Sequence, residues 1–224
     1  RITTERLATW IGAATPLTEI AVLARVNAAL LPVQVMCAEA GIPCWTPVAA
    51  SVLERTGAKA ALAYLRIANS VALGASIEGR DIAVAARRPP RSLPPYVFDQ
   101  LQRRTWTLAK LRALQSSLND RATERFLEFV DGIEKLGATA ADTLTLLRAV
   151  RDEIGLGGAL ETLDRSGKGP DGSHADDLNA LMAVAPLQPD PVAFEPWLRG
   201  RLPATARSAN DGDTVALSTV HRVK

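Results

Sequence analysis

Two short strand-like segments at opposite ends of the chain constrain its fold more than any other feature. Residues 20–27 read IAVLARVN, and residues 215–224 read VALSTVHRVK. Each contains a brief apolar run beside turn-forming residues, which is typical of a buried strand. Strands far apart in sequence can pair side by side in one sheet. If these two pair, everything between them is an insertion carried on one small sheet.

Helical patterns fill most of that insertion. Pro32 suits the first turn of a helix that Gly41 would end, and residues 42–46 are a second brief strand candidate. Four prolines between positions 89 and 95 predict a rigid connector. We therefore expect a mainly α chain, in which a helical domain is set into a small α/β piece built from the two chain ends. Further helices are predicted at residues 3–11, 57–69, 77–86, 121–136, 140–154, 174–185 and 191–201, and a long one from Pro94 that carries Leu101, Leu108 and Leu111.

Composition limits the classes of protein that the chain can be. With 224 residues and 47% hydrophobic content it can bury one or two cores, and no apolar run reaches the roughly 18 residues that span a membrane. Cys37 and Cys44 are too few for a disulfide framework or a zinc site, so we expect reduced, mostly buried thiols in a cytoplasmic protein. His174 and the acidic pair just after it are interpreted as a helix start rather than a metal site.

The net charge of +2 is unevenly distributed along the chain. Residues 80–112, here called the basic block, hold eight Lys or Arg against two Asp, whereas residues 113–224 hold twelve Lys or Arg against seventeen Asp or Glu. Such a block can be a phosphate-binding face. It can equally be a solvated helix face, and composition alone does not separate the two.

The phosphate-loop candidate in the sequence fails on its spacing. A Walker A loop places one Gly five positions before a Gly-Lys pair, and Ser or Thr follows the Lys. Around Gly167 and Lys168, the first of these positions holds Thr162 and the last holds Gly169. The sequence therefore has no evident means of hydrolysing ATP by itself.

Polar side chains follow both end strands. Arg25 and Asn27 come directly after the first, and Thr219, His221 and Lys224 lie at the end of the second. Residues just past the carboxyl ends of strands line the ligand crevice of open α/β sheets. Arginine pairs with phosphate, and asparagine hydrogen-bonds backbone or base edges. A surface arginine and a turn-forming asparagine are the alternative.

Together these segments resemble the UvrD/Rep/PcrA-type superfamily 1 DNA helicases. Residues 20–27 look like the family's IAVLYRxN strand, and residues 40–43 match the AGIP that ends the next helix. Residues 53–55 and 60–69 are similar to FxER and DALAYLRLIAN, and residues 217–224 look like LMTxHxxKG, cut before its Gly. Order and spacing also fit, so the resemblance spans essentially the whole chain, although the middle matches only by helical pattern.

The resemblance implies a RecA-like fragment that carries an accessory domain. Residues 1–48 and 208–224 would belong to motor subdomain 2A, and residues 49–207 would form the helical subdomain 2B, which rotates as a rigid body in the family. Intact relatives are ATP-dependent and move 3′ to 5′ along single-stranded DNA in repair or recombination. Because the chain starts at Arg1 without Met or a signal peptide and stops before the motif's Gly, we expect a piece of the C-terminal region of a bacterial, cytoplasmic helicase.

The resemblance also implies site residues, cofactors and partners. The residues that match Arg25, Asn27, Thr219 and His221 touch the tracking strand in such relatives, and Lys224 ends a motif that approaches the nucleotide. ATP and Mg²⁺ would be cofactors of the full-length ATP hydrolase; this piece lacks the Walker motifs, should be inactive alone, and is expected to bind neither and to hold no catalytic residue. Expected partners are single-stranded and duplex DNA, the rest of the motor (subdomain 1A and the remainder of 2A) and repair proteins, with no membrane.

One departure from the family concerns duplex DNA. Subdomain 2B carries an RGIG turn at a helix N-terminus, and the turn grips duplex phosphates through backbone amides. The matching residues 91–94 keep the arginine but neither glycine, and Pro94 has no N–H to donate. Duplex contact would then depend on four side chains of this segment: Arg87, Arg88, Arg91 and Ser92.

Two other interpretations remain open at this point. The missing glycines and the modest net charge would also suit a non-catalytic helical protein-interaction module that regulates a helicase. A helicase–nuclease fusion of the RecB or AddA type would share these motifs and carry a nuclease further along the chain.

Overall fold

The two end strands lie side by side. In the computed structural model, β1 (Ala21–Ala24) pairs in parallel with β3 (Val215–Thr219), which pairs in parallel with β2 (Cys44–Trp45), so the strand order is β1-β3-β2. The predicted pairing of segments from opposite ends of the sequence is therefore confirmed. The prediction that the first of them is a buried strand is wrong, because the residues of β1 are alternately exposed and half-buried, whereas β3 is mostly buried. The structure describes residues 6, 9–10, 12–13, 15–139, 142–167, 174–205 and 213–220.

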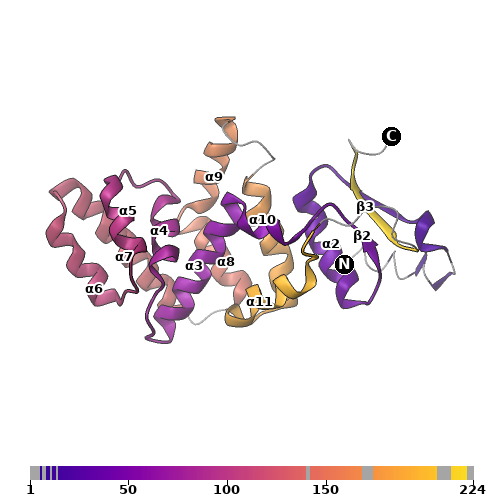
Figure 1. The fold of residues 1–224 in the computed structure, drawn as a ribbon, viewed down its shortest axis with the longest axis horizontal. Coiled ribbons are helices and arrows are strands. Elements are labelled where there is room, and N and C mark those ends of the chain that lie inside the picture. Colours follow the sequence, from indigo (N-terminus) through magenta and orange to yellow (C-terminus); the bar gives the residue numbers. More distant parts are fainter. Residues whose placement is uncertain are drawn as a thin grey trace.

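The chain leaves the sheet after β2 and returns to it before β3. The 3-10 helix η2 (Asn27–Leu30) and helix α2 (Leu31–Glu39) connect β1 to β2. The 3-10 helix η3 (Ala50–Glu54) leads away from the sheet, and α11 (Pro191–Arg201) leads back towards it. In Figure 1 the sheet and α2 occupy one end of an elongated molecule, and the other helices extend away from them. The described chain is mainly helical, as expected.

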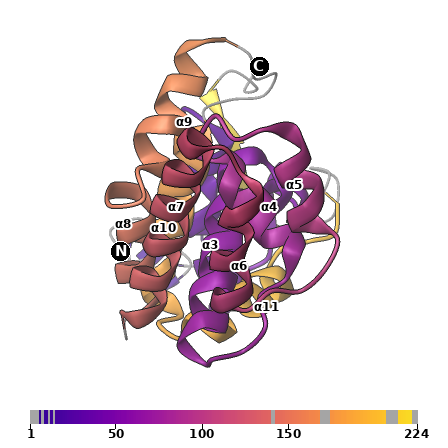
Figure 2. The same ribbon diagram turned by 90° about the vertical axis from the view of Figure 1, so that its left-hand side faces the viewer.

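The helices gather around α3 (Thr56–Ala72). It packs against α4, α7, α8, α10 and α11, and the view along the molecule in Figure 2 has α3 among them. Tyr64, at its centre, is fully buried. The other α-helices of the described chain are α4 (Gly79–Arg87), α5 (Pro95–Gln102), α6 (Leu108–Ala113), α7 (Asp120–Ala138), α8 (Thr143–Asp152), α9 (Leu156–Arg165) and α10 (His174–Val184). Short 3-10 helices also lie at η1 (Leu17–Glu19), η4 (Leu114–Ser117) and η5 (Ala185–Leu187).

Local signals in the sequence account for several helix boundaries. The side chains of Asn119, Asp142 and Asp190 accept hydrogen bonds from backbone N–H groups at the starts of α7, α8 and α11, at 3.0, 2.9 and 2.9 Å. Such caps satisfy donors that have no partner within the helix. After α2, Gly41 adopts a left-handed backbone with φ of 67°, which favours glycine and ends the helix as predicted.

Glycine also permits the closest helix contacts. A Cβ on Gly137 of α7 would lie 2.3 Å from the side chain of Val71 in α3. A Cβ on Gly57, at the start of α3, would lie 2.2 Å from the carbonyl oxygen of His174 in α10. Both separations are far below van der Waals contact, so these two interfaces require the absence of a side chain.

The long helix predicted from Pro94 is wrong, because two helices with a break between them occupy that stretch. The backbone of Trp106 lies in the break and exchanges two hydrogen bonds with Ile77, at 2.7 and 2.8 Å. Its buried indole N–H donates to the carbonyl oxygen of Leu101 at 2.8 Å. A residue whose backbone pairs with another segment cannot also continue a helical ladder, so α5 ends before it and α6 starts after it. Helix α9 has no counterpart among the predicted helices.

Some predictions fall wholly or largely outside the described residues, namely the helix at residues 3–11 and the loops at residues 165–173 and 208–213. No helix in the described part of the chain is both long enough and apolar enough to cross a lipid bilayer.

Candidate nucleic-acid interface

The carboxyl ends of β1 and β3 meet at one edge of the sheet. Ala24 and Thr219, the last residues of the two strands, are in register. Arg25 and Val220 follow them, and both are exposed. None of the acidic side chains that the structure describes forms an ion pair with Arg25. Thr219 is 8% exposed, so a ligand could reach only a small part of it.

Asn27 lies just beyond this edge, as the first residue of η2. Its side-chain Oδ1 is buried and accepts no hydrogen bond from the described residues. A buried acceptor without a donor costs about 1–3 kcal/mol, so such atoms are uncommon in folded proteins. A donor brought by a bound molecule would satisfy it.

The structure describes only some of the residues that were predicted at this edge. The structure brings Arg25, Asn27 and Thr219 together, as the sequence predicts. His221 and Lys224 lie outside the described residues.

The second predicted group lies at the end of α4 and in the turn that follows. The guanidinium of Arg87 stacks over the ring of Phe98, 4.6 Å from its centroid. Arg88 donates to the carbonyl oxygen of Arg87 at 3.3 Å. Ser92 is exposed and has a left-handed backbone with φ of 50°. Arg87, Arg88 and Ser92 can therefore present side chains to solvent on this turn.

Arg91 is directed inward instead. Its guanidinium donates to the carbonyl oxygens of Ala85 at 3.0 Å and Pro89 at 2.9 Å, and to the hydroxyl of Tyr64 at 3.0 Å. It also lies over the ring of Phe129, 4.7 Å from the centroid. These contacts tie the turn to the core, and a DNA phosphate would have to compete with them.

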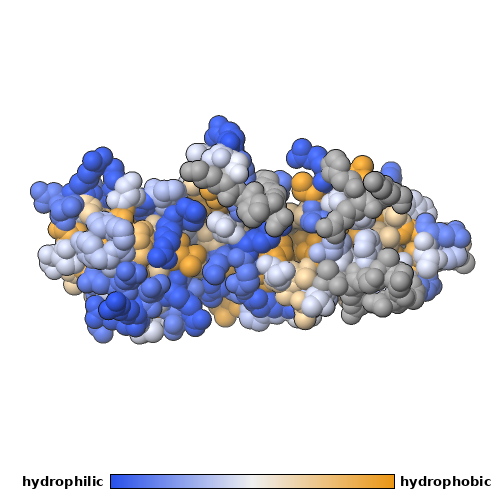
Figure 3. Space-filling view, turned by 45° about the horizontal axis from the view of Figure 1, so that its top comes forward, coloured by the Kyte–Doolittle hydropathy of each residue, from blue (hydrophilic) through white to orange (hydrophobic). Residues whose placement is uncertain are grey.

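Other cations of the basic block also have partners within the protein. Arg112 forms ion pairs with Asp131, at 2.6 Å, and with Glu134. The guanidinium of Arg104 lies 4.4 Å from the ring centroid of Trp106. In Figure 3, hydrophilic residues dominate the visible face of the helical part, and hydrophobic residues surface only in separate small areas. Several cations of the basic block are therefore bound to different partners within the protein.

The two predicted groups lie far apart along the molecule. In Figure 1, β3 lies at one end, and α4 and α5 lie towards the other. The structure thus holds two separate candidate contact regions. We call them the sheet edge (Arg25, Asn27 and Thr219) and the helical turn (Arg87, Arg88, Arg91 and Ser92).

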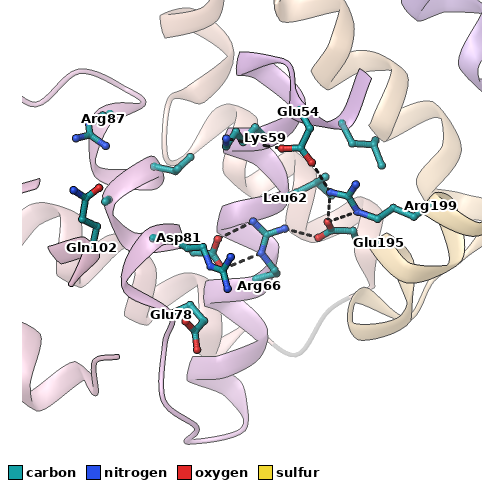
Figure 4. Close-up of a pocket in the computed structure, with 14 residues that line it drawn as sticks. Glu54, Lys59, Leu62, Arg66, Glu78, Asp81, Arg87, Gln102, Glu195 and Arg199 are labelled. Atoms are coloured by element: carbon teal, nitrogen blue, oxygen red, sulfur yellow. Dashed lines mark hydrogen bonds and ion pairs between the residues drawn. The ribbon is translucent and has the colours of Figure 1, made fainter. Parts of the chain in front are cut away.

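A cavity of about 490 Å³ between η3, α3, α4 and α11 holds a set of ion pairs that the sequence did not predict (Figure 4). Arg66 binds Asp81 through two bonds of 2.7 and 2.9 Å, and it also binds Glu195. Arg199 lies 2.9 Å from both Glu195 and Glu54. Burial alone would lower the pKa of Arg66, but the hydrogen bonds and charges of Asp81 and Glu195 outweigh burial and raise it. This ion-pair ladder joins the segment that leaves the sheet to the helix that returns.

A sequence signal for the ladder does exist. Arg66 interrupts a run of Ala and Leu in α3, and Asn69 follows one turn later on the same side of the helix. Asn69 donates to the carbonyl oxygen of Pro191 in α11 at 3.0 Å. Two polar residues one turn apart, next to a run of apolar residues, indicate a polar contact with a neighbouring helix.

A buried carboxyl group lies at the start of α10. Asp177 is 1% exposed, and its Oδ2 lies 3.1 Å from Nε of Arg55 in an ion pair without hydrogen-bond geometry. Burial raises the pKa of Asp177 to about 6; Arg55 opposes this, and Asp176 and Asp164 add to it. The interpretation of His174 and its neighbours as a helix start is confirmed. Among the described residues, no cluster of three or more His, Cys, Asp or Glu could hold a metal ion.

No protein-family model matches this chain, and none of the curated proteins matches it either.

Proposed function

We propose that the chain is a DNA-contacting part of a UvrD/Rep/PcrA-type ATP-dependent 3′–5′ DNA helicase. The sheet would belong to motor subdomain 2A, and the helices would form the inserted subdomain 2B. The observation that carries the proposal is the parallel pairing of β1 with β3, the two segments whose sequences resemble the family's motifs. The whole protein would work in the cytoplasm on repair or recombination intermediates, with the rest of the motor as its partner.

The sheet edge has the chemistry to hold a nucleic-acid backbone. The exposed guanidinium of Arg25 can donate two parallel hydrogen bonds to a phosphate. The amide of Asn27 has an acceptor that no described residue uses, and a base or sugar donor could occupy it. These contacts lie where ligands bind open α/β sheets, at the carboxyl ends of the strands.

In this proposal, the ATP site lies in the rest of the motor. The Gly-Lys pair of Gly167 and Lys168 has Thr162 where a Walker A loop needs glycine, and no Ser or Thr follows it. At the sheet edge, the described donors are one guanidinium, one amide and one largely buried hydroxyl, which do not form a phosphate-binding loop. Hydrolysis of ATP would therefore be carried out by the rest of the motor.

The test is DNA binding by the chain across a range of salt concentrations, measured by fluorescence anisotropy with a single-stranded oligonucleotide and a tailed duplex. Several phosphate contacts predict a steep loss of affinity with salt. Arg25→Ala should lower affinity for the single strand by roughly tenfold and reduce the salt slope by about one. Arg148→Ala, at an exposed arginine of α8, is the matched control and should change neither. Equal effects of the two substitutions, or no binding at low salt, would contradict the proposal.

One observation favours the protein-interaction alternative for the helical part. Arg91 and Arg112 bind groups within the protein rather than facing solvent freely. Arg87→Glu combined with Arg88→Glu separates the two functions. A duplex-binding turn predicts a selective loss of affinity for the tailed duplex, whereas unchanged affinity for both DNAs assigns this turn to protein contact.

A further inference from the structure

Two cysteine side chains are neighbours where α2 meets β2. Cys37 lies in the last turn of α2, Cys44 is the first residue of β2, and both are reduced. The Cys44 thiol donates to the carbonyl oxygen of Ile42 at 3.3 Å, and the neighbouring Cys44 side chain lowers the pKa of the Cys37 thiol while burial raises it. A lowered pKa favours the thiolate of Cys37, the form that attacks a neighbouring oxidised sulfur.

The backbone between the two cysteines fixes their proximity. The left-handed turn at Gly41 reverses the chain, and the N–H of Ile42 donates to the carbonyl oxygen of Cys37 at 2.8 Å. Side chains two residues apart in an extended segment point to the same side. Because the backbone of Ile42 is hydrogen-bonded to the last turn of α2, Cys44, two residues later, also lies near that end of the helix.

A buried hydrogen-bond network holds the other side of this junction. The hydroxyl of Thr46 donates to the side chain of Gln34 in α2 at 2.7 Å, and Gln34 donates to the carbonyl oxygen of Val48 at 3.1 Å. Gln34 lies about one helical turn before Cys37. Hydrogen bonds to α2 therefore lie on both sides of Cys44, from Ile42 before it and from Thr46 after it. They keep the two thiols close together without a covalent bond.

The two thiols differ in their access to solvent. Cys37 is 0% exposed, whereas Cys44 is half-buried and lines a cavity of about 220 Å³. Ala38 of α2 and Arg201 and Pro203 of the returning segment also line this cavity. A small reagent therefore reaches Cys44 first, and Cys37 lies behind it.

We propose that Cys37 and Cys44 form a redox-sensitive pair that a hydroperoxide converts to an intramolecular disulfide. The Cys44 sulfur attacks one peroxide oxygen, the O–O bond breaks, and Cys44 becomes a sulfenic acid while hydroxide leaves and is protonated to water. The Cys37 sulfur then attacks the Cys44 sulfur, the S–OH bond breaks, and a second water carries away the Cys37 proton. Two thiols are oxidised by two electrons, and hydrogen peroxide is reduced to two waters.

The disulfide would covalently join α2 to the strand that pairs with β3. Cys44 is in register with Val215, so the cross-link would be made at the edge of the sheet. A dithiol reductant reverses the reaction by thiol–disulfide exchange. In a reducing compartment the bond would therefore form only during oxidative stress.

The test is mass spectrometry of the purified chain after brief treatment with hydrogen peroxide and quenching with N-ethylmaleimide. We expect a product that has lost two hydrogen atoms, takes up no maleimide and yields a Cys37–Cys44 linked peptide. Treatment with dithiothreitol should restore both thiols to maleimide labelling. Sulfinic acid or maleimide adducts on both cysteines as the main products, or a disulfide between two chains, would overturn the proposal.

Single variants test the order of the two steps. In Cys37→Ala, the Cys44 sulfenic acid has no resolving thiol, so it should be trapped by dimedone and progress to sulfinic acid. In Cys44→Ala, the buried Cys37 should stay reduced at the same peroxide concentration. Rapid oxidation of Cys37 in Cys44→Ala would show that Cys44 is not the point of attack. The linked peptide of the unmodified chain remains decisive even where a variant folds poorly.

Discussion

Replacing Arg66 by glutamine should destabilise the fold far more than replacing a surface arginine that has just as many ion pairs. Arg66 forms two bonds to Asp81, whose side chain is 8% exposed, and one to Glu195, whose side chain is 17% exposed. In Arg66→Gln, Glu195 keeps its bond to Arg199. The loss of stability therefore comes mainly from Asp81, whose charged carboxylate would stay largely buried without its partner Arg66.

The expected size follows from that burial. Breaking a buried ion pair by removing one partner costs roughly 3–5 kcal/mol. The Arg66 side chain is itself 40% exposed, so water can reach part of the space that it leaves. We therefore expect about 2–3 kcal/mol, which corresponds to a fall in the melting temperature of roughly 4–12 °C for a chain of this length.

Arg112→Gln is the matched control. Arg112 also binds two carboxylates, but the side chains of Asp131 and Glu134 are 61% and 49% exposed. Exposed pairs contribute about 0–1 kcal/mol because water solvates the charges after the pair is broken. The control should therefore change stability by about 1 kcal/mol at most.

Urea unfolding followed by circular dichroism measures both effects. Adding Asp81→Asn to Arg66→Gln should recover at least half of the loss, because the amide carries no charge to strand. If Arg66→Gln and Arg112→Gln cost the same, or if Asp81→Asn brings no recovery, burial of Asp81 does not govern the energetics of the ladder.

Three further predictions concern buried positions. Because the pKa of Asp177 is raised from 3.8 to about 6, its protonated form stabilises the fold, and that stability is present below pH 3.8 and lost as the pH rises through about 6. Asp177→Asn should abolish this dependence in thermal melts, a change of up to about 3 kcal/mol. Tyr64→Phe removes a buried hydroxyl that both donates and accepts hydrogen bonds, and it should lower the free energy of unfolding in urea by about 1–3 kcal/mol. Tyr96→Phe at the surface should lower it by about 0.5 kcal/mol or less. Gly57→Ala should cost roughly 3 kcal/mol or more, because the new methyl group meets a backbone oxygen, whereas Gly158→Ala in α9 enters open space and should stabilise the chain by up to about 1 kcal/mol.

The end strands could be predicted because their signals are local. A brief apolar run next to turn residues is typical of a strand, and Gly41 supplies a left-handed turn that ends α2. The break at Trp106 could not be predicted in the same way, since it depends on backbone pairing with Ile77 far earlier in the chain. Helix α9 was missed for a different reason. Gly157 and Gly158 lower its helix propensity, and packing against α8 and α10 compensates.

The candidate site residues also differ in whether local sequence signals predict their positions. Arg25 and Thr219 could be placed together from sequence, because strand pairing and register alone set their positions. The role of Arg91 could not, because its partners include Tyr64 in α3 and Phe129 in α7, which meet the turn after α4 only in the folded chain. Charge counting finds arginines, but it does not show which of them already have partners.

If the chain binds DNA as proposed, the existing contacts of Arg91 favour the sheet edge as the main contact. A phosphate that recruits Arg91 must replace four hydrogen bonds and the contact with Phe129. At about 0.5–1.5 kcal/mol for each hydrogen bond and roughly 1 kcal/mol for the ring contact, that loss equals or exceeds the gain from one charged phosphate contact. Arg25 gives up no ion pair with the described residues, so nearly all of its phosphate interaction would appear as affinity. The helical turn can add Arg87, Arg88 and Ser92, but Pro94 and Pro95 supply no N–H donors at the start of α5, where a phosphate-binding helix end uses backbone amides.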